Sequence, residues 1–439
     1  MRPRVSWSGC LLPEHAGHPP VARTLRASVQ RTHGLKLQAL AVLASSVLSN
    51  LATVSVTLWL IRHLGSEAFG KAALVASVAS SFASFTASGL ALYLLRALSA
   101  APRRDGACPE WSAAHLGGQL LAGAVSVAAT CTLIVTVQDW SAVDLVLAAV
   151  ILHSMTMDAV SKNALAGNQN VVTLAVVTAV GGLASAGLQA SGGAMAGGRG
   201  YLAGLAIGCV VQALLSWAAC RSRASGCIPS GVDLRQAWQC LRGQELLRFV
   251  VPASLSASLV PLAHASASGI SAAKGSFSDV AVLTVAMQFF NMVMFLPTVI
   301  NKIILPSTIR ADAADAAGRR SRLRRQTLWL STAFLAPLLV WLLQPLIREA
   351  YRFESPSSAR VLILFAAAAA VACTLIPMAN ALVSGNRMWF GLTTNVVWAT
   401  CYVGLAWFLP GAAMAVGVAL LVAYIVNMGV LSFAARNQG

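Results

Sequence analysis

The chain of 439 residues is 57% hydrophobic and only 10% charged, with a mean hydropathy of +0.72 and a formal net charge of +17 at pH 7. This composition excludes an ordinary soluble globular protein and is typical of a chain that crosses a bilayer many times. Such a positive charge is also typical of nucleic-acid binding, so the positions of the basic residues decide between the two interpretations.

Hydropathy divides the chain into twelve apolar stretches of membrane-spanning length. A hydrocarbon core about 30 Å thick requires roughly 20 mostly apolar residues in an α-helix. The sequence therefore predicts an all-α polytopic membrane protein. In chain order the predicted spans are Leu35–Ile61, Gly70–Leu95, Ala113–Val137, Val143–Ser161, Val171–Ala190, Tyr201–Ala219, Phe249–Ala272, Val280–Leu305, Thr327–Ile347, Val361–Val383, Trp389–Leu409 and Ala412–Phe433.

The basic residues alternate between the two sides of the membrane. Twenty-three of the Lys and Arg residues fall in the N-terminal segment, the C-terminal segment and every second connection, whereas seven fall in the other connections. Because cytoplasmic loops retain Lys and Arg, both termini are predicted to be cytoplasmic. Topology and attraction to anionic lipid head groups account for the charge of +17, so nucleic-acid binding is not expected.

Residues 1–34 precede the first span. They carry Arg, His and Pro but no apolar core followed by a cleavage site, so we expect a flexible basic cytoplasmic arm rather than a signal peptide. The longest inner connection, 221–248, divides the spans into two sets of six. The predicted organisation is an N-lobe at 35–220, this cytoplasmic linker, and a C-lobe at 249–439.

The two halves share a short outer connection. Residues 63–75, after the first span, and 273–284, after the seventh, each contain a Lys, a Gly, a Ser and a Phe before an apolar span. This similarity indicates a weak internal repeat. Bundles built from repeats are typical of transporters, whose substrate sites lie at the repeat interface.

Catalytic and metal-binding patterns are missing from the sequence. No connection is long enough to fold as a soluble catalytic domain. The nine cysteines show no CxxC pair or other metal-ligand spacing, and we interpret most of them as small buried hydrophobic residues. We therefore predict no enzyme activity, no metal and no cofactor.

Ionisable residues inside the spans are few, and each is a candidate because a charge in hydrocarbon is costly. Asp158 and Lys162 in the fourth span are four residues apart, so they share a helix face and can pair. An ion pair is the simpler interpretation, and an ion-coupling site is the alternative. His153, deeper in that span, is either a proton relay or a structural histidine. His264 lies in the seventh span.

Two cations lie at matching inner ends of spans. Lys302 is about one turn from the inner end of the eighth span, and Arg96 is at the inner end of the second. An anionic lipid head group needs compensating positive charge when it leaves water, so both residues are candidate ligands for phosphate. Alternatively, the Lys302 side chain simply extends to the membrane–water interface and binds no phosphate.

The connection after the first span resembles a known family signature. Leu60 to Gly70 reads LIRHLGSEAFG, which is similar to the pattern aRxLGpexfG of polysaccharide and O-antigen flippases. Three further segments resemble the same family in order and spacing. They are Arg96 to Ser99 at the end of span two, Phe295 to Ser307 in span eight, and Leu382 to Arg387 after span ten. The resemblance covers about Leu35 to Ala435.

This family belongs to the multidrug/oligosaccharidyl-lipid/polysaccharide exporter (MOP) superfamily. The resemblance implies two six-helix lobes around a central cavity that opens alternately to each side. It implies transport of an undecaprenyl diphosphate-linked oligosaccharide across the bacterial cytoplasmic (inner) membrane during surface polysaccharide biosynthesis. The implied partners are the lipid-linked oligosaccharide and the lipid bilayer, together with a polysaccharide polymerase and glycosyltransferases.

The resemblance also implies roles for individual residues. Arg62, Gly65, Phe69 and Gly70 would form an outer turn or gate element. The two inner cations introduced above, at positions 96 and 302, would attract the diphosphate head group.

Three other functions remain open. A drug or metabolite exporter of the same superfamily is expected to carry carboxylates for cationic substrates, whereas Asp158 is nearly the only acid deep in a span. A membrane glycosyltransferase or polymerase needs catalytic acids or a large outer loop, and the sequence shows neither. A non-transporting component of a polysaccharide assembly complex would tolerate neutralisation of Arg96 and Lys302.

Overall fold

The computed structural model describes most of the chain. The predicted arm at 1–34 and most of the linker at 221–248 lie outside the described residues, as do the side chains of Arg96 and Lys302. Inner and outer below refer to the predicted topology. The described ranges are 44–45, 47–100, 114–126, 141–168, 170–223, 246–314, 319–351, 356–384 and 387–436.

Every regular element in those ranges is a helix, and the prediction of an all-α membrane protein is confirmed. Eight helices are long and apolar enough to cross a membrane, or nine if one bent pair is counted as a span. The helices are Val47–Leu64, α2 (Ser66–Ala100), 114–126, α4 (Ala142–Gly167), α5 (Val171–Arg223), η1 (Leu246–Val250), α7 (Val251–Lys274), α8 (Phe277–Ala314), α9 (Arg319–Leu330), η2 (Ser331–Phe334), α10 (Leu335–Leu342), α11 (Gln344–Tyr351), α12 (Pro356–Ser384), α13 (Met388–Phe408) and α14 (Ala413–Arg436).

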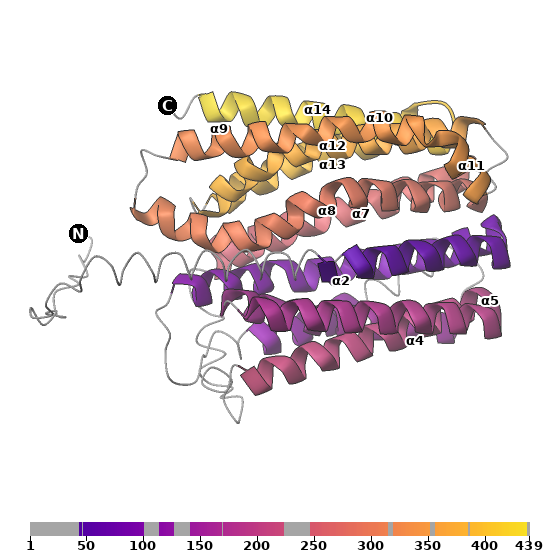
Figure 1. The fold of residues 1–439 in the computed structure, drawn as a ribbon, viewed down its shortest axis with the longest axis horizontal. Coiled ribbons are helices and arrows are strands. Elements are labelled where there is room, and N and C mark those ends of the chain that lie inside the picture. Colours follow the sequence, from indigo (N-terminus) through magenta and orange to yellow (C-terminus); the bar gives the residue numbers. More distant parts are fainter. Residues whose placement is uncertain are drawn as a thin grey trace, which may run out of the picture.

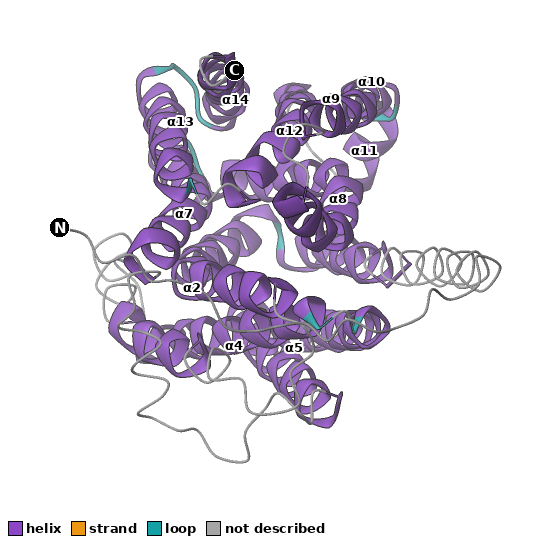
Figure 2. Cartoon of the chain, turned by 90° about the vertical axis from the view of Figure 1, so that its left-hand side faces the viewer, coloured by secondary structure: helices purple, strands orange, loops and turns teal. Residues whose placement is uncertain are grey.

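The two halves of the chain form two layers of helices that run along the long axis of the molecule (Figure 1). α2, α4 and α5 lie in one layer, and α7, α8, α12, α13 and α14 lie in the other. α2 packs against α4 in its own half and against α7 and α8 in the other half. Seen end-on, α2 lies between these neighbours (Figure 2). The helix Val47–Leu64 and α2 form an interface with α7, α8 and α11 of the other half. This interface is called the seam below.

Close packing in the second half depends on alanine. α12 packs against both α8 and α14, and the side chains of Ala366, Ala369 and Ala370 are fully buried there. Small side chains let helix backbones approach closely, which is the main source of helix association where lipid replaces water. The alanine-rich sequence of α12 therefore explains its central position.

Spans five and six form one tight hairpin, which corrects the predicted loop between them. Helix continues from Val171 to Arg223 except at Ala196 (φ −139°) and Gly197 (φ 62°), where the chain turns back. A Cβ at Gly200 would overlap the carbonyl oxygen of Gly192, and one at Gly204 would overlap that of Leu188. The two arms therefore touch through their backbones, which glycine alone allows.

The corresponding connection in the second half is built in a similar way. α13 ends at Phe408, α14 begins at Ala413, and Gly411 between them has a φ of 93°. A positive φ favours glycine at both places because a Cβ is strained there. A glycine with a positive φ thus lies in both connections, the one between spans five and six and the one between spans eleven and twelve. This similarity agrees with an internal repeat.

The ninth span is broken, whereas the sequence analysis predicts one continuous helix over Thr327–Ile347. α9 leads through the 3₁₀ turn η2 into α10, and the axis then bends by 61° before α11. Pro345 lies just after the bend and Pro337 lies within α10. Proline lacks an N–H and its ring clashes with the carbonyl four residues earlier, so it shortens or bends the helix that precedes it.

Candidate functional site

The predicted outer turn joins the two halves of the chain. Gly65 adopts a φ of 83°, and its N–H donates to the carbonyl of Ile61 at 3.0 Å, which ends the first helix. Arg62, three residues earlier, donates from Nε to the carbonyl oxygen of Ala350 in α11 at 2.8 Å. Arg62 therefore links the outer end of the first span to the outer end of the ninth.

The start of α2 packs closely against both halves. Phe69 is buried, and its ring centroid lies 5.9 Å from that of Tyr201 in the sixth span. A Cβ at Gly70 would overlap the carbonyl oxygen of Phe277, the first residue of α8. The four residues of the predicted gate element thus lie together at a closed outer contact. There Phe69 packs against Tyr201 of the first half, and Gly70 packs against Phe277 of the second half.

The middle of the seam is polar. Gln288 in α8 donates to the hydroxyl of Thr57 at 2.6 Å, and Ser81 in α2 donates to the carbonyl oxygen of Pro261 in α7 at 2.8 Å. Near the inner end, a Cβ at Gly89 would overlap the hydroxyl oxygen of Ser254. Hydrogen bonds between neutral groups are easily exchanged for bonds to water, so a polar seam suits an interface that opens and closes.

Asp158 and Lys162 form the ion pair that their spacing predicts. The distance from Lys162 Nζ to Asp158 Oδ2 is 2.7 Å, and the two side chains are 19% and 18% exposed. Ser216 of the sixth span donates to the other carboxylate oxygen, Oδ1, at 2.5 Å. Both oxygens of Asp158 therefore have partners within the first half of the chain.

His153 does not join this pair. It precedes Asp158 by five residues, which places the two side chains about 140° apart around the helix. Its Nδ1 is buried without a hydrogen-bond partner, and its backbone carbonyl accepts from Gln119 Nε2 at 3.5 Å. Among the described residues, no hydrogen bond connects His153 to Asp158, so a direct proton relay between them has no structural support.

The two predicted phosphate ligands lie in helices at the inner end. Arg96 is in the last turns of α2, and Lys302 is in the inner part of α8. Their side chains lie outside the described residues, so their predicted role stays a prediction. Asn301, next to Lys302, accepts a hydrogen bond from Asn380 of α12 at 2.5 Å.

The second half also contains a buried aromatic cluster around His264, a candidate that the sequence analysis places in the seventh span without a specific role. His264 Nδ1 lies 3.2 Å from the hydroxyl oxygen of Tyr402, and its ring makes edge contacts with Trp398 and Phe290. Trp398 and Tyr402 are both 1% exposed. In the sequence, the only signal of this cluster is the four-residue spacing of Trp398 and Tyr402, which places both on one face of an apolar span. Only the fold shows that α7 packs against α13. Trp398, Tyr402 and Phe290 belong to the buried core of the second half, so we interpret the cluster as a packing feature.

Metal chemistry has no support in the described residues, where no three His, Cys, Asp or Glu side chains gather closely enough to hold an ion. Described hydroxyls and amides also occur along the seam and at the inner end of the second half.

Comparisons with known proteins identify the fold. No protein-family model matches the chain, and no curated protein matches its sequence. An outward-facing multidrug resistance MATE family transporter of the MOP superfamily matches with a TM-score of 0.67 and 15% identity, over 92% of this chain and 95% of that one. The lipid II flippase MurJ, in an inward closed conformation, gives 0.66 and 14%, over 91% and 87%. A Vibrio cholerae MATE transporter gives 0.64 and 14%, over 92% and 98%.

The chain has the fold of these solved transporters and of the flippase. The solved structures named above are transporters and a flippase. They include both multidrug transporters and a flippase for a lipid-linked substrate, and identities of 14–15% show a shared fold only. Residues of this chain therefore have to distinguish between the two kinds of substrate.

Proposed function

We propose that the chain is a flippase that moves an undecaprenyl diphosphate-linked oligosaccharide across the bacterial cytoplasmic membrane during surface polysaccharide biosynthesis. The lobes at 35–220 and 249–439 would rock about the seam, with the linker and both termini in the cytoplasm. A polysaccharide polymerase and glycosyltransferases would act on the same lipid-linked oligosaccharide before and after transport.

The distribution of acidic residues carries this proposal. Asp158 is the one described acid deep in a span, and Lys162 and Ser216 occupy both of its oxygens. Four other described acids lie at outer helix ends, and they are Glu67, Asp144, Asp279 and Glu349. Asp312 is near the inner end of α8, and its side chain lies outside the described residues. The described spans thus offer no free carboxylate to a cationic drug. The sequence instead places cations, Arg96 and Lys302, at the inner ends of two helices of the seam.

Physical chemistry supports a flippase for such a substrate. A sugar chain with a diphosphate cannot cross hydrocarbon unaided because the loss of hydration is too costly. A cleft that opens alternately to each side removes this barrier without any covalent step, and the lipid tail stays in the bilayer. Ion coupling, the membrane potential or removal of product outside would supply the driving force.

The alternative is a drug or metabolite exporter. The match to an outward-facing multidrug transporter, with a TM-score of 0.67, favours it. Under this alternative the chain would carry a fluorescent organic cation across a vesicle membrane, and an undecaprenyl diphosphate-linked oligosaccharide would not compete.

Reconstitution into lipid vesicles tests the proposal. The full chain is expected to make a lipid-linked oligosaccharide accessible in the opposite leaflet, as scored with a membrane-impermeant glycosidase or lectin. Arg96→Ala and Lys302→Ala are each expected to reduce the rate by about tenfold or more, since each removes a charge-assisted contact. Arg221→Ala, which removes an exposed arginine at the inner end of the sixth span, is the matched control.

Translocation equal to that of protein-free vesicles, with a control flippase active, would disprove the flippase function. Full activity in the Arg96→Ala, Lys302→Ala double variant would remove these two residues from the mechanism and leave the function itself intact.

A further inference from the structure

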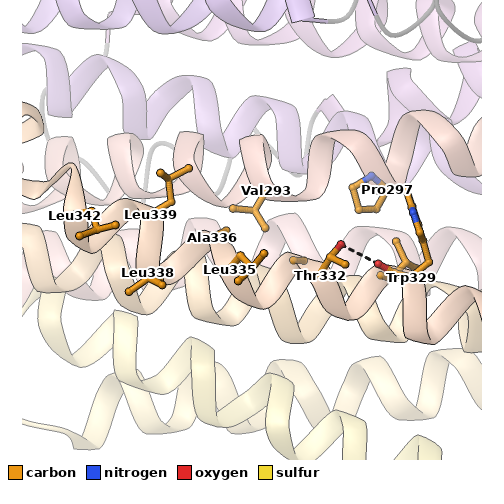
Figure 3. Close-up of a pocket in the computed structure, with 11 residues that line it drawn as sticks. Val293, Pro297, Trp329, Thr332, Leu335, Ala336, Leu338, Leu339 and Leu342 are labelled. Carbon is orange, nitrogen blue, oxygen red and sulfur yellow. Dashed lines mark hydrogen bonds between the residues drawn. The ribbon is translucent and has the colours of Figure 1, made fainter.

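The second half of the chain contains a long apolar groove. It lies between α8 and the broken ninth span, and its volume is about 480 Å³. Figure 3 shows Val293 and Pro297 on α8 facing Trp329, Leu335, Ala336 and Leu339. The groove ends near Leu342 at its outer end. α9, η2 and α10 pack against α12, and the groove lies on the side of the ninth span that faces α8.

A second cavity of about 320 Å³ adjoins the inner end of the groove. Pro297, Trp329 and Leu330 line both spaces, so the two adjoin, and together they are called the joined cavity below. Four polar side chains line this second part, and they are Asn301, Arg325, Gln326 and Asn380. The joined cavity is therefore polar at its inner end and apolar along the rest of its length.

The polar end is also positively charged. Arg325 is exposed and has no acidic partner among the described residues. It is the last of five arginines in the sequence Arg-Arg-Ser-Arg-Leu-Arg-Arg at the start of α9. The predicted ninth span begins two residues later, so Arg325 lies at the depth of the lipid head groups. Basic pockets between helices at this depth favour anionic lipid phosphates.

The size of the apolar part fits one acyl chain. A methylene group is about as large as a water molecule, which takes up ≈ 30 Å³, so about 480 Å³ holds about sixteen chain carbons. From Trp329 to Leu342 the helical rise amounts to roughly 20 Å, which is somewhat more than one leaflet of hydrocarbon. A much longer polyprenyl chain would lie mostly outside the groove.

We propose that this joined cavity binds an anionic glycerophospholipid of the inner leaflet. Its phosphate lies against Arg325 and the amides of Gln326 and Asn380, and one acyl chain follows the groove along α10. The bound lipid fills the space that the proline-broken span leaves open beside α8. This site does not depend on which substrate the protein carries.

Lipid binding to the purified full chain tests this proposal by native mass spectrometry. The probes are phosphatidylglycerol and phosphatidylcholine with the same sixteen- and eighteen-carbon chains, titrated into detergent solution. One phosphatidylglycerol is expected to bind in preference to phosphatidylcholine. Arg325→Gln is expected to weaken phosphatidylglycerol binding by about tenfold, because the lipid phosphate loses one charge-assisted hydrogen bond.

A second variant tests the groove. Ala336→Phe fills it and is expected to weaken binding of both lipids by about tenfold, since the chain loses several buried methylene contacts. Arg221→Gln and Ala218→Phe are the matched controls, because they make the same changes at exposed positions near the inner end of the sixth span. Both controls are expected to bind as the unchanged protein does. Circular dichroism and a monodisperse elution profile establish that each variant is folded.

Equal binding of the two lipids, or equal losses in the variants and their controls, would overturn the proposal. It would also be overturned if undecaprenyl phosphate displaced phosphatidylglycerol at a lower concentration, since the site would then belong to the carrier lipid. A dimer that Ala336→Phe converts to a monomer would assign the groove to a second copy of the chain instead.

Discussion

Asp158 shows how a buried charge is neutralised in a span. Lys162 pairs with one carboxylate oxygen and Ser216 donates to the other, and both bonds stay within the first half of the chain. A pair that is satisfied within one half does not need to break when the halves move. We therefore expect it to stabilise the fold, and the ion-coupling role remains the alternative.

Removal of one partner tests the structural role of this pair. Asp158→Leu should destabilise the protein by about 3 kcal/mol because it leaves Lys162 as an unpaired charge of low exposure. The double variant Asp158→Leu, Lys162→Met should recover most of this loss and keep transport activity. Thermal unfolding in detergent and vesicle transport provide the two measurements. A stable double variant without transport would show that the pair couples an ion.

Glu67→Gln serves as the control for this experiment. It neutralises an exposed carboxylate in the first turn of α2, where the interaction with the helix dipole contributes only about 0.3–1 kcal/mol.

Gly70 sets the closest approach of the two halves at the outer end of the seam. Gly70→Val should separate α2 from Phe277, because any Cβ there overlaps the carbonyl oxygen. A cysteine introduced at the fully buried Ala281 should then react several-fold faster with a membrane-impermeant maleimide added from outside. Gly123→Val is the matched control, since no atom lies within 4 Å of a Cβ at that position. Equal labelling in both backgrounds would contradict a gating contact at Gly70.

At the level of elements, the hairpin in α5 is held by a row of glycines. Three glycines of the second arm face the first arm at intervals of four residues. Gly200 lies against Gly192, Gly204 against Leu188 and Gly208 against Ser185. Such a row places all three glycines on one helix face and lets the backbones touch. Spans five and six thus associate through main-chain contact rather than through large side chains.

Two glycines of this hairpin should respond in opposite ways to the same change. Gly204→Ala forces the arms apart and should cost about 1–3 kcal/mol of stability. Gly187→Ala, in the same hairpin, meets no atom within 4 Å and should stabilise the protein by about 0.5–1 kcal/mol through the higher helix propensity of alanine. Thermal unfolding of the full chain compares them. A loss of stability at both positions would show that arm packing is not the cause.

For the whole molecule, alternating access requires the seam to separate at one end while it stays closed at the other. In the structure the outer end is closed by Gly70 against Phe277 and by the bond from Arg62 to Ala350. Thr57 and Gln288 are joined by a hydrogen bond further along the seam, toward its middle. A covalent link at that place should therefore stop the cycle.

A cross-link between Thr57→Cys and Gln288→Cys tests this motion. Oxidation should reduce transport to background, and a reducing agent should restore it. The control pair is Thr86→Cys with Thr156→Cys, whose native hydroxyl oxygens lie 2.6 Å apart between α2 and α4 of the same half. Oxidation of the control pair should leave transport unchanged. Transport that continues through the cross-linked seam would rule out rocking of the two halves.

Much of the fold follows from hydropathy and from glycine and proline. The described parts of the predicted spans are helical, because roughly 20 apolar residues in lipid have no other way to satisfy their backbone hydrogen bonds. The break before Pro345 and the hairpin at Gly197 were also readable in principle, since each residue imposes a known backbone constraint. Predicted boundaries differ where helix extends beyond the apolar run, as at Ala100 and Ala314.

The candidate site was predictable in part. The four-residue spacing of Asp158 and Lys162 predicts their pair, because it depends on one helix alone. The contributions of Ser216 and of Ala350, which accepts from Arg62, were not predictable, since they depend on which helices become neighbours.

The sequence by itself determined the class of this protein and its helices, and it predicts which side of the membrane holds most of the basic residues. These features depend on local composition and on the cost of placing charges in lipid. Only the tertiary structure decided which residues meet across the seam and that the broken ninth span leaves a cavity with a cationic end beside α8. Contacts between helices arise from side-chain shape over long sequence separations, and no local pattern records them.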